Sequence, residues 1–326
     1  MKQHGILMRW CSLAALAAGV LFAAPVSAQS YPARPITFIY PFPQGSGPEI
    51  VMRQLAGHVG NALGQNIVVE IRTGSAGRNA LKAMATGPKD GYLIGFASAS
   101  ELITQALADP SLEAEPRVHF APVIVAFKNF QVLYANAAAP FKDGRAMLAY
   151  AKANPGKLNW GTSPGIAGHL TLELLKAATG LDIVYVPFRG GPPAITALLG
   201  GDIDLVSTDS APKPLVDAGK LIALGTTNSQ RRKPFPDLPT LQEQGLSGFE
   251  VTTWHSVIAP PGTAPEAIAK LRQAYSNALK LPDVIRKLEE LGAEPADLGP
   301  DEFVALVQAD LKKWGPIVKK LGLKFN

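Results

Sequence analysis

The chain has 326 residues, of which 47% are apolar and 17% charged, with a formal net charge of +5. That apolar fraction suffices for a hydrophobic core and excludes a disordered or low-complexity protein, and the length favours about two domains. Basic residues are spread along the sequence, without the patch or motif of a nucleic-acid-binding protein. The single cysteine, Cys11, excludes an intramolecular disulfide and a cysteine-based metal site.

The first 28 residues have the pattern of a secretory signal peptide. Lys2 and Arg9 precede an apolar stretch at 13–22, and Val26-Ser27-Ala28 supplies the small residues that a signal peptidase reads. We expect cleavage after Ala28; an uncleaved anchor is the alternative, but the apolar stretch is short for a bilayer span. The mature chain then has no cysteine and no later run of 18 apolar residues, as expected of an exported soluble protein.

Short β-rich runs alternate with helical patterns along most of the mature sequence. Strands are predicted at 36–40, 67–71, 92–97, 123–127, 131–135, 157–160, 183–186, 203–207 and 222–226. Helices are predicted between them, at 49–63, 145–153, 168–179, 193–199 and 211–218. This alternation with short connections predicts an α/β fold whose mainly parallel sheets carry helices on both faces.

The C-terminal part reads as three successive helices, at 265–280, 282–291 and 300–321, each opened by a proline. A helical tail must cover a surface built earlier in the chain. We therefore expect a discontinuous first lobe of residues 29–128 plus 252–326, and an inserted second lobe of residues 129–251.

The turn Gly45-Ser46-Gly47-Pro48-Glu49 follows the first strand and opens a helix. Its glycines allow close approach of a ligand, and the free N–H groups of a helix start favour an anion. A dinucleotide fingerprint would need a third glycine where Ile50 stands. The turn therefore predicts an anion cradle, with a plain strand-to-helix turn as the alternative.

Gly161-Thr162-Ser163-Pro164-Gly165 fits the nucleophile-elbow pattern of serine hydrolases. In that elbow the residue after the serine donates its N–H to the oxyanion, and Pro164 has none. Loss of one such donor costs about 10²–10³ in rate, and only His255 follows in the order required of a base. A hydrolase is thus the disfavoured alternative to a polar loop that contacts a ligand through Thr162, Ser163 and Gly165.

The remaining polar residues assemble no catalytic centre and no metal site. The five histidines lack metal-ligand spacing, so we expect structural roles for them and no cofactor or metal. Arg78 and Arg189 lie next to glycines after predicted strands, where an arginine either clamps a carboxylate or ties loops together. Asp209 follows a strand and either caps a helix or faces a ligand. We expect the turn 45–49 and the loop 161–165 to face each other from the two lobes. This arrangement favours a protein that holds a ligand between the lobes without converting it.

Many short segments, in order along nearly the whole mature chain, resemble the Bug family, the periplasmic receptors of tripartite tricarboxylate transporters. The matching segments include Tyr31-Pro32, Pro41-Phe42-Pro43, Pro88-Lys89-Asp90-Gly91-Tyr92, Phe120-Ala121-Pro122-Val123, Asn154-Pro155-Gly156-Lys157, Val186-Pro187-Phe188-Arg189-Gly190, Leu198-Leu199-Gly200-Gly201-Asp202, Pro236-Asp237-Leu238-Pro239, Ala259-Pro260-Pro261-Gly262 and Leu291-Gly292-Ala293-Glu294.

The resemblance implies a Venus-flytrap fold of two lobes that closes on a small carboxylate. It implies ligand contacts at Phe42, Gly45, Ser46, Gly47, Glu49, Thr162, Ser163, Gly165 and Asp209, to which we add Arg78. Three features depart from the family pattern: the first turn, Gly45-Ser46-Gly47-Pro48-Glu49, Pro164 in the second loop, and Arg78. Whether the ligand is aliphatic or aromatic, with one or two carboxylates or an amino group, stays open.

The resemblance also implies a monomeric, non-enzymatic periplasmic protein whose partners are the membrane subunits of a transporter. A sensor that reads the liganded receptor is an alternative partner.

Overall fold

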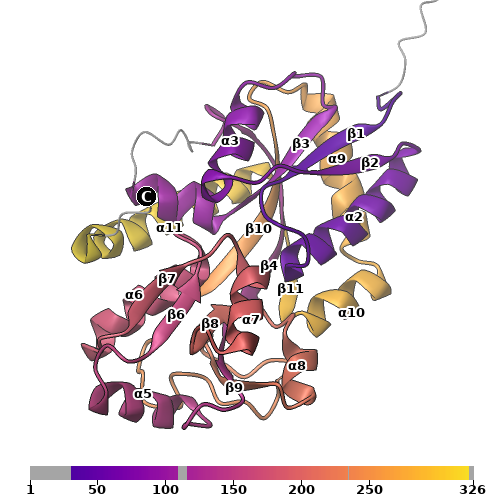
Figure 1. Ribbon diagram of the computed structural model, residues 1–326. Helices are drawn as coiled ribbons and strands as arrows, with labels where there is room; N and C mark the ends of the chain where they lie inside the picture. The colour runs from indigo at the N-terminus through magenta and orange to yellow at the C-terminus, as the bar shows by residue number, and fades with distance from the viewer. Residues whose placement is uncertain (1–30, 109–115, 234, 323–326) are drawn as a thin grey trace, which may run out of the picture.

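The computed structural model describes residues 31–108, 116–233 and 235–322 and has an α/β fold of two lobes, each built around one sheet (Figure 1). The expected signal peptide, residues 1–28, lies outside the described residues. Within the described residues, no helix is long and apolar enough to cross a membrane. We call the six-stranded sheet with its helices the first lobe, and the five-stranded sheet with its helices the second lobe.

The sheet of the first lobe combines strands from both ends of the described chain, in the order β11-β4-β10-β3-β1-β2. Its strands are β1 (Ile36–Tyr40), β2 (Ile67–Ile71), β3 (Leu93–Ser98), β4 (Ala121–Phe130), β10 (Thr252–Ala259) and β11 (Ala293–Leu298). The central strands are almost continuously buried because helices cover both faces of the sheet.

The helices of the first lobe come from the N-terminal and C-terminal parts of the chain. They are α2 (Gly47–Leu63), η1 (Ser75–Gly77), α3 (Arg78–Ala85), a π-helical turn η2 (Ser100–Gln105), α4 (Ala106–Ala108), α9 (Pro265–Ala278), α10 (Pro282–Glu290) and α11 (Pro300–Leu321). α2 contacts α9 and α10, and α11 contacts β4 and η2. The C-terminal helices therefore pack on the first lobe.

The second lobe has the strand order β7-β6-β8-β5-β9. Its strands are β5 (Val132–Asn136), β6 (Asn159–Thr162), β7 (Val184–Pro187), β8 (Leu205–Thr208) and β9 (Leu221–Thr226), and its helices are α5 (Gly144–Ala153), α6 (Ala167–Thr179), α7 (Gly191–Gly200) and α8 (Lys213–Asp217). α6 and α7 contact β8, and α5 and α8 contact β9.

Both sheets are mixed, which corrects the expectation of mainly parallel sheets. β1 pairs in parallel with β2 and β3, whereas β10 lies antiparallel between β3 and β4. In the second lobe β6 is parallel to its neighbours, and β5 is antiparallel to β8 and β9. The antiparallel pairs arise where the chain passes from one sheet to the other and back.

The chain changes sheet twice, between β4 and β5 at Gln131 and between β9 and β10 over residues 227–251. The division at 128/129 and 251/252 stays a prediction. A further difference concerns the C-terminal tail, because β11 stands between α10 and α11 and joins the edge of the first sheet beside β4. β10, β11 and α3 were not predicted.

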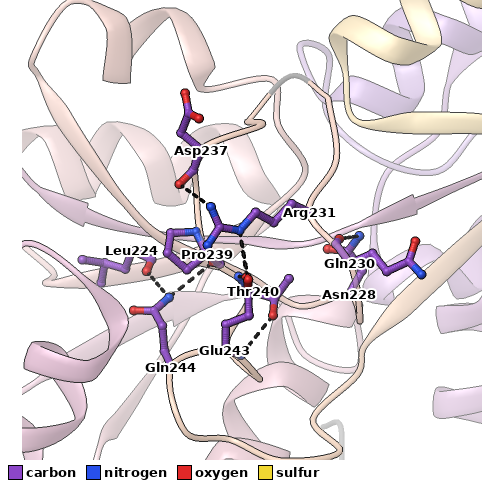
Figure 2. Close-up of polar contacts among 9 residues, drawn as sticks. All are labelled: Leu224, Asn228, Gln230, Arg231, Asp237, Pro239, Thr240, Glu243 and Gln244. Carbon is purple, nitrogen blue, oxygen red and sulfur yellow. Dashed lines mark hydrogen bonds and ion pairs between the residues drawn. The ribbon is translucent and has the colours of Figure 1, made fainter.

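The return segment between β9 and β10 is fixed to the second lobe by polar contacts (Figure 2). Buried Gln244 donates from Nε2 to the Leu224 carbonyl at 2.8 Å, while its Oε1 accepts from the Gly144 N–H at 2.6 Å. Arg231 donates from Nε to Glu243 at 3.0 Å in an exposed ion pair (Figure 2). The segment thus ties β9 to the start of α5.

Candidate functional site

Two adjoining cavities lie between the lobes and share Phe42 and Pro43 in their walls. The first has a volume of about 300 Å³ and the second about 730 Å³. Both volumes lie in the usual range for small-molecule sites. Each is lined by residues of both lobes. The first lobe contributes to both cavities through the segment that follows β1.

Aromatic rings form one wall of the first cavity. Tyr40, at the end of β1, packs edge-on against Phe96 of β3 with ring centroids 4.9 Å apart, and Phe42 lies edge-on to both rings. His255 of β10 stacks on Phe96 at 5.5 Å. The second lobe supplies the opposite wall with Ile166, Ala167, Pro192, Ile195, Pro212 and Leu215.

His255 lies against the aromatic wall of the first cavity and is held in its neutral form. Burial between Phe96 and Phe127 lowers the pKa of His255 to about 3. Its Nε2 lies 2.9 Å from the Asn129 side-chain oxygen, so the neutral ring donates from Nε2. The histidine therefore carries no positive charge toward a ligand near neutral pH, and the structural role expected for it is consistent with this geometry.

Polar groups at the ends of β3 and β4 also line the first cavity, among them Ser98, Ser100, Asn129 and Gln131. Behind them, the Glu101 carboxylate accepts from the Ser98 N–H at 2.8 Å and the Ser98 hydroxyl at 2.7 Å. Burial raises the pKa of Glu101 to about 7, and its Oε1 has no hydrogen-bond partner among the described residues.

Asp209 is the one charged residue in the described lining of the first cavity. It follows β8 of the second lobe, is 7% exposed, and accepts from the Ala211 N–H at 2.9 Å. The Gly47 N–H of the first lobe also bonds to this carboxylate; burial raises the pKa of Asp209, and the two N–H bonds oppose that rise. A Cβ added to Gly47 would lie 2.8 Å from the carboxylate.

The expected anion cradle at the start of α2 therefore holds carboxylates of the chain itself. Gly47 bonds to Asp209, and the Gly45 N–H donates to Glu49 over a long 3.4 Å. Glu49 is buried and also accepts from Arg53 at 2.7 Å. Gly45 and Ser46 line the first cavity, and the Ser46 hydroxyl lies 2.8 Å from the Tyr40 hydroxyl.

The second cavity lies beside the first and has a different charge. Its described lining includes Arg78, at the start of α3, and Arg189, after β7, with no carboxylate among them. The glycine-rich segment 73–77 of the first lobe faces Pro187 and Phe188 of the second. Arginine is well suited to carboxylates because its guanidinium presents several N–H donors in one plane.

Ser163 also lines the second cavity, but its contacts do not activate it as a nucleophile. Its hydroxyl donates to the Phe188 carbonyl at 2.7 Å. His169 accepts from the Gly165 N–H at 3.1 Å, and burial lowers its pKa to about 4. His255, the base that a hydrolase would need, bonds to Asn129. Within the described part of the chain, the Ser163 hydroxyl has no hydrogen bond to the adjacent base that nucleophilic catalysis requires.

The ten residues predicted to contact a ligand do not form one group. The first cavity is lined by Phe42, Gly45, Ser46 and Asp209, and the second by Phe42, Arg78 and Ser163. Gly47, Glu49, Thr162 and Gly165 line neither cavity. Gly47 and Ser163 therefore share no cavity, although Ile166 and Ala167, just after the second loop, reach the first cavity.

Several lining residues were not predicted, including Tyr40, Phe96, Ser98, Asn129 and Gln131. The available signal was the placement of hydroxyl and amide residues at the ends of apolar strands: Ser98 follows 93–97, and Asn129 and Gln131 follow 121–127. Such polar residues in buried strands need partners or face a cavity. Among the described residues, no cluster of three histidine or acidic side chains could hold a metal ion.

Known proteins match this chain over most of its length. The model of the family described as "Tripartite tricarboxylate transporter family receptor" matches residues 51–323. BugT of Bordetella pertussis is 33% identical over 310 residues, which cover 93% of this chain and 94% of BugT. Two similar solved structures are the periplasmic binding protein BugD (TM-score 0.85, 29% identity, 90% of this chain and 99% of BugD) and an R. palustris protein with adipate (TM-score 0.86, 31% identity, 90% and 99%).

Proposed function

This chain belongs to the family of tripartite tricarboxylate transporter receptors, and on that premise we propose that it captures a small organic carboxylate between its two lobes. The observation that carries the proposal is the pair of cavities whose walls come from both lobes. A ligand held there contacts both lobes at once, so it stabilises their closed arrangement by its differential affinity for that arrangement. The adipate bound by the R. palustris relative is a carboxylate of this class.

The contacts proposed for the ligand are those of the lining residues. Phe42, Gly45 and Ser46 of the first lobe face Asp209 of the second across the first cavity, and Arg78 faces Ser163 across the second. A micromolar receptor needs about 8 kcal/mol of binding free energy. Hydrogen bonds to a charged group contribute about 1.5–3 kcal/mol each, so a few of them with burial of the carbon skeleton suffice.

We further propose that the protein acts in the periplasm as a monomer, after removal of residues 1–28. Its partners are the membrane subunits of a tripartite tricarboxylate-type transporter, which read the closed form. We propose binding without catalysis, because the Ser163 hydroxyl donates to a backbone carbonyl and bonds to no base among the described residues. A sensor that reads the same closed form stays the alternative partner, and co-purification of the liganded protein with membrane extract distinguishes the two.

The proposed function is tested by a ligand screen on residues 29–326. Thermal shift across a broad panel of carboxylates identifies candidates, and isothermal titration calorimetry measures their affinities. We expect one-to-one binding of at least one carboxylate with a micromolar or lower Kd. A cooperatively melting sample that binds no member of the panel contradicts the proposal.

A further inference from the structure

The two cavities between the lobes carry opposite charges, and this segregation sets the orientation of a ligand. The described lining of the first cavity contains one charged group, the buried Asp209 carboxylate, and no lysine or arginine. The described lining of the second contains two guanidinium groups, Arg78 and Arg189, and no carboxylate. A ligand anion is therefore repelled by the charge of one cavity and attracted by that of the other.

The backbone N–H groups beside Asp209 already bond to carboxylates of the chain itself. The Gly47 N–H and the Ala211 N–H bond to Asp209, and the Gly45 N–H bonds to Glu49. His255 is neutral and donates to Asn129. A ligand carboxylate could bond to these N–H groups only by displacing one of the chain's own carboxylates, and it would also lose its hydration.

The walls of the first cavity suit an uncharged, ring-sized group. Tyr40, Phe42 and Phe96 form an edge-to-face aromatic cluster on one side, and Ile166, Ile195 and Leu215 face it from the second lobe. Aromatic rings favour such offset and edge-on contacts, which add to the burial of apolar area. The cavity can thus bury the carbon skeleton of a ligand without pairing a charge.

The described lining of the second cavity has the positively charged side chains that the first cavity lacks. Arg189 is exposed and has no carboxylate partner among the described residues, and it directly precedes Gly190 and Gly191, which line the first cavity. Arg78 approaches from the first lobe. A carboxylate placed between these guanidiniums would bond to both lobes while its carbon skeleton passes Phe42, which the two cavities share.

From this arrangement we propose that the ligand is a monocarboxylate with an apolar, ring-sized body. Its carboxylate binds between Arg78 and Arg189 in the second cavity, and its ring occupies the aromatic-walled first cavity. This inference rests on the proposed function and narrows its ligand class, because a straight-chain dicarboxylate would place its second charge beside Asp209.

The test is isothermal titration calorimetry of residues 29–326 with benzoate, phenylacetate and cyclohexanecarboxylate, compared with succinate, adipate and the amides benzamide and phenylacetamide. At least one ring monocarboxylate is expected to bind at least tenfold more tightly than its amide and than either dicarboxylate. Equal or tighter binding of a dicarboxylate overturns the inference while leaving the proposed function intact. Absence of binding by every carboxylate in a folded sample overturns both.

Arginine variants test the orientation. Arg189→Gln and Arg78→Gln are each expected to weaken binding of the ring monocarboxylate at least tenfold. Arg145→Gln removes an exposed guanidinium from α5 of the second lobe, outside both cavities, and is expected to change the affinity less than twofold. Unchanged affinity in both cavity variants, with wild-type melting temperatures, would place the carboxylate elsewhere and refute the proposal.

Discussion

The carboxylate of Asp209, from the second lobe, lies against the backbone of Gly47 in the first turn of α2, in the first lobe. A negative group at a helix N-terminus is stabilised by the N–H groups that have no partner within the helix. Here that group is a side chain of the opposite lobe, so the contact joins the two halves of the site. Because it forms only when the lobes are close, it favours the closed arrangement.

Gly47→Ala should weaken ligand binding by disturbing this contact. The added Cβ would lie 2.8 Å from the Asp209 carboxylate, which must move away from the N–H group of residue 47. Gly57→Ala, in the same helix, adds a methyl group with nothing within 4 Å and is expected to stabilise the fold by about 0.5–1 kcal/mol. Calorimetry should show that Gly47→Ala lowers the ligand affinity at least tenfold and that Gly57→Ala leaves it unchanged. Equal affinities of the two variants would show that the contact does not contribute to binding.

Glu101 should make stability decrease as pH rises. Its pKa is about 7 in the folded protein and 4.5 without burial, so the folded state holds more protons between those values. Its contribution to stability is therefore present below about pH 4.5 and is lost as pH rises through 7. As pH rises from about 4.5 to 7, the free energy of unfolding of Glu101→Gln should increase relative to that of the wild type by on the order of 3 kcal/mol. Urea denaturation measures both free energies.

The control for this pH dependence is Glu266→Gln, which neutralises an exposed carboxylate on α9. Its stability should follow that of the wild type at each pH. If the difference between Glu101→Gln and the wild type is the same at pH 5 and pH 8, the buried carboxylate does not titrate as described.

Gln244→Ala should destabilise the second lobe. The substitution leaves the buried Gly144 N–H and Leu224 carbonyl without the partner that both have in the wild type. Unsatisfied buried groups cost about 1–3 kcal/mol each, so a loss of about 3 kcal/mol is expected. Arg231→Ala, which removes a neighbouring exposed ion pair, should barely change the melting temperature. Equal shifts for the two variants would rule out the structural role of Gln244.

Ser163→Ala should leave esterase activity unchanged, because the wild type is expected to have none above the buffer. The Ser163 hydroxyl donates to the Phe188 carbonyl and has no hydrogen bond to a histidine of the described ranges. Hydrolysis of p-nitrophenyl acetate by both proteins tests this expectation. Turnover by the wild type that disappears in Ser163→Ala would establish catalysis.

The alternation of strands and helices was predictable where apolar runs are uninterrupted, as in β1 and β2, whose bounds agree with the prediction. β10 was missed because Thr253, His255 and Ser256 interrupt its apolar pattern. These polar residues are buried and find partners: the Ser256 hydroxyl donates to Ala97, and His255 bonds to Asn129. β11 contains Pro295 and Asp297, which are rare within strands.

The site was predictable only in part, for a physical reason. A turn such as 45–49 is recognisable because its glycines and its position before a helix are local features. Asp209 lies about 160 residues after Gly47 in the sequence, and its bond to the Gly47 N–H depends on how the two sheets are placed. No local pattern in the sequence encodes that placement. The second loop was expected to face the first turn, whereas its residue Ser163 lies in the adjoining cavity beside Arg78.

A crystal structure of residues 29–326 with the carboxylate that binds most tightly tests the account most directly. We predict electron density for the ligand in the cavities between the lobes, in contact with at least one residue of each lobe and with its carboxylate near Arg78 and Arg189. Density confined to the surface of a single lobe would contradict capture between the lobes.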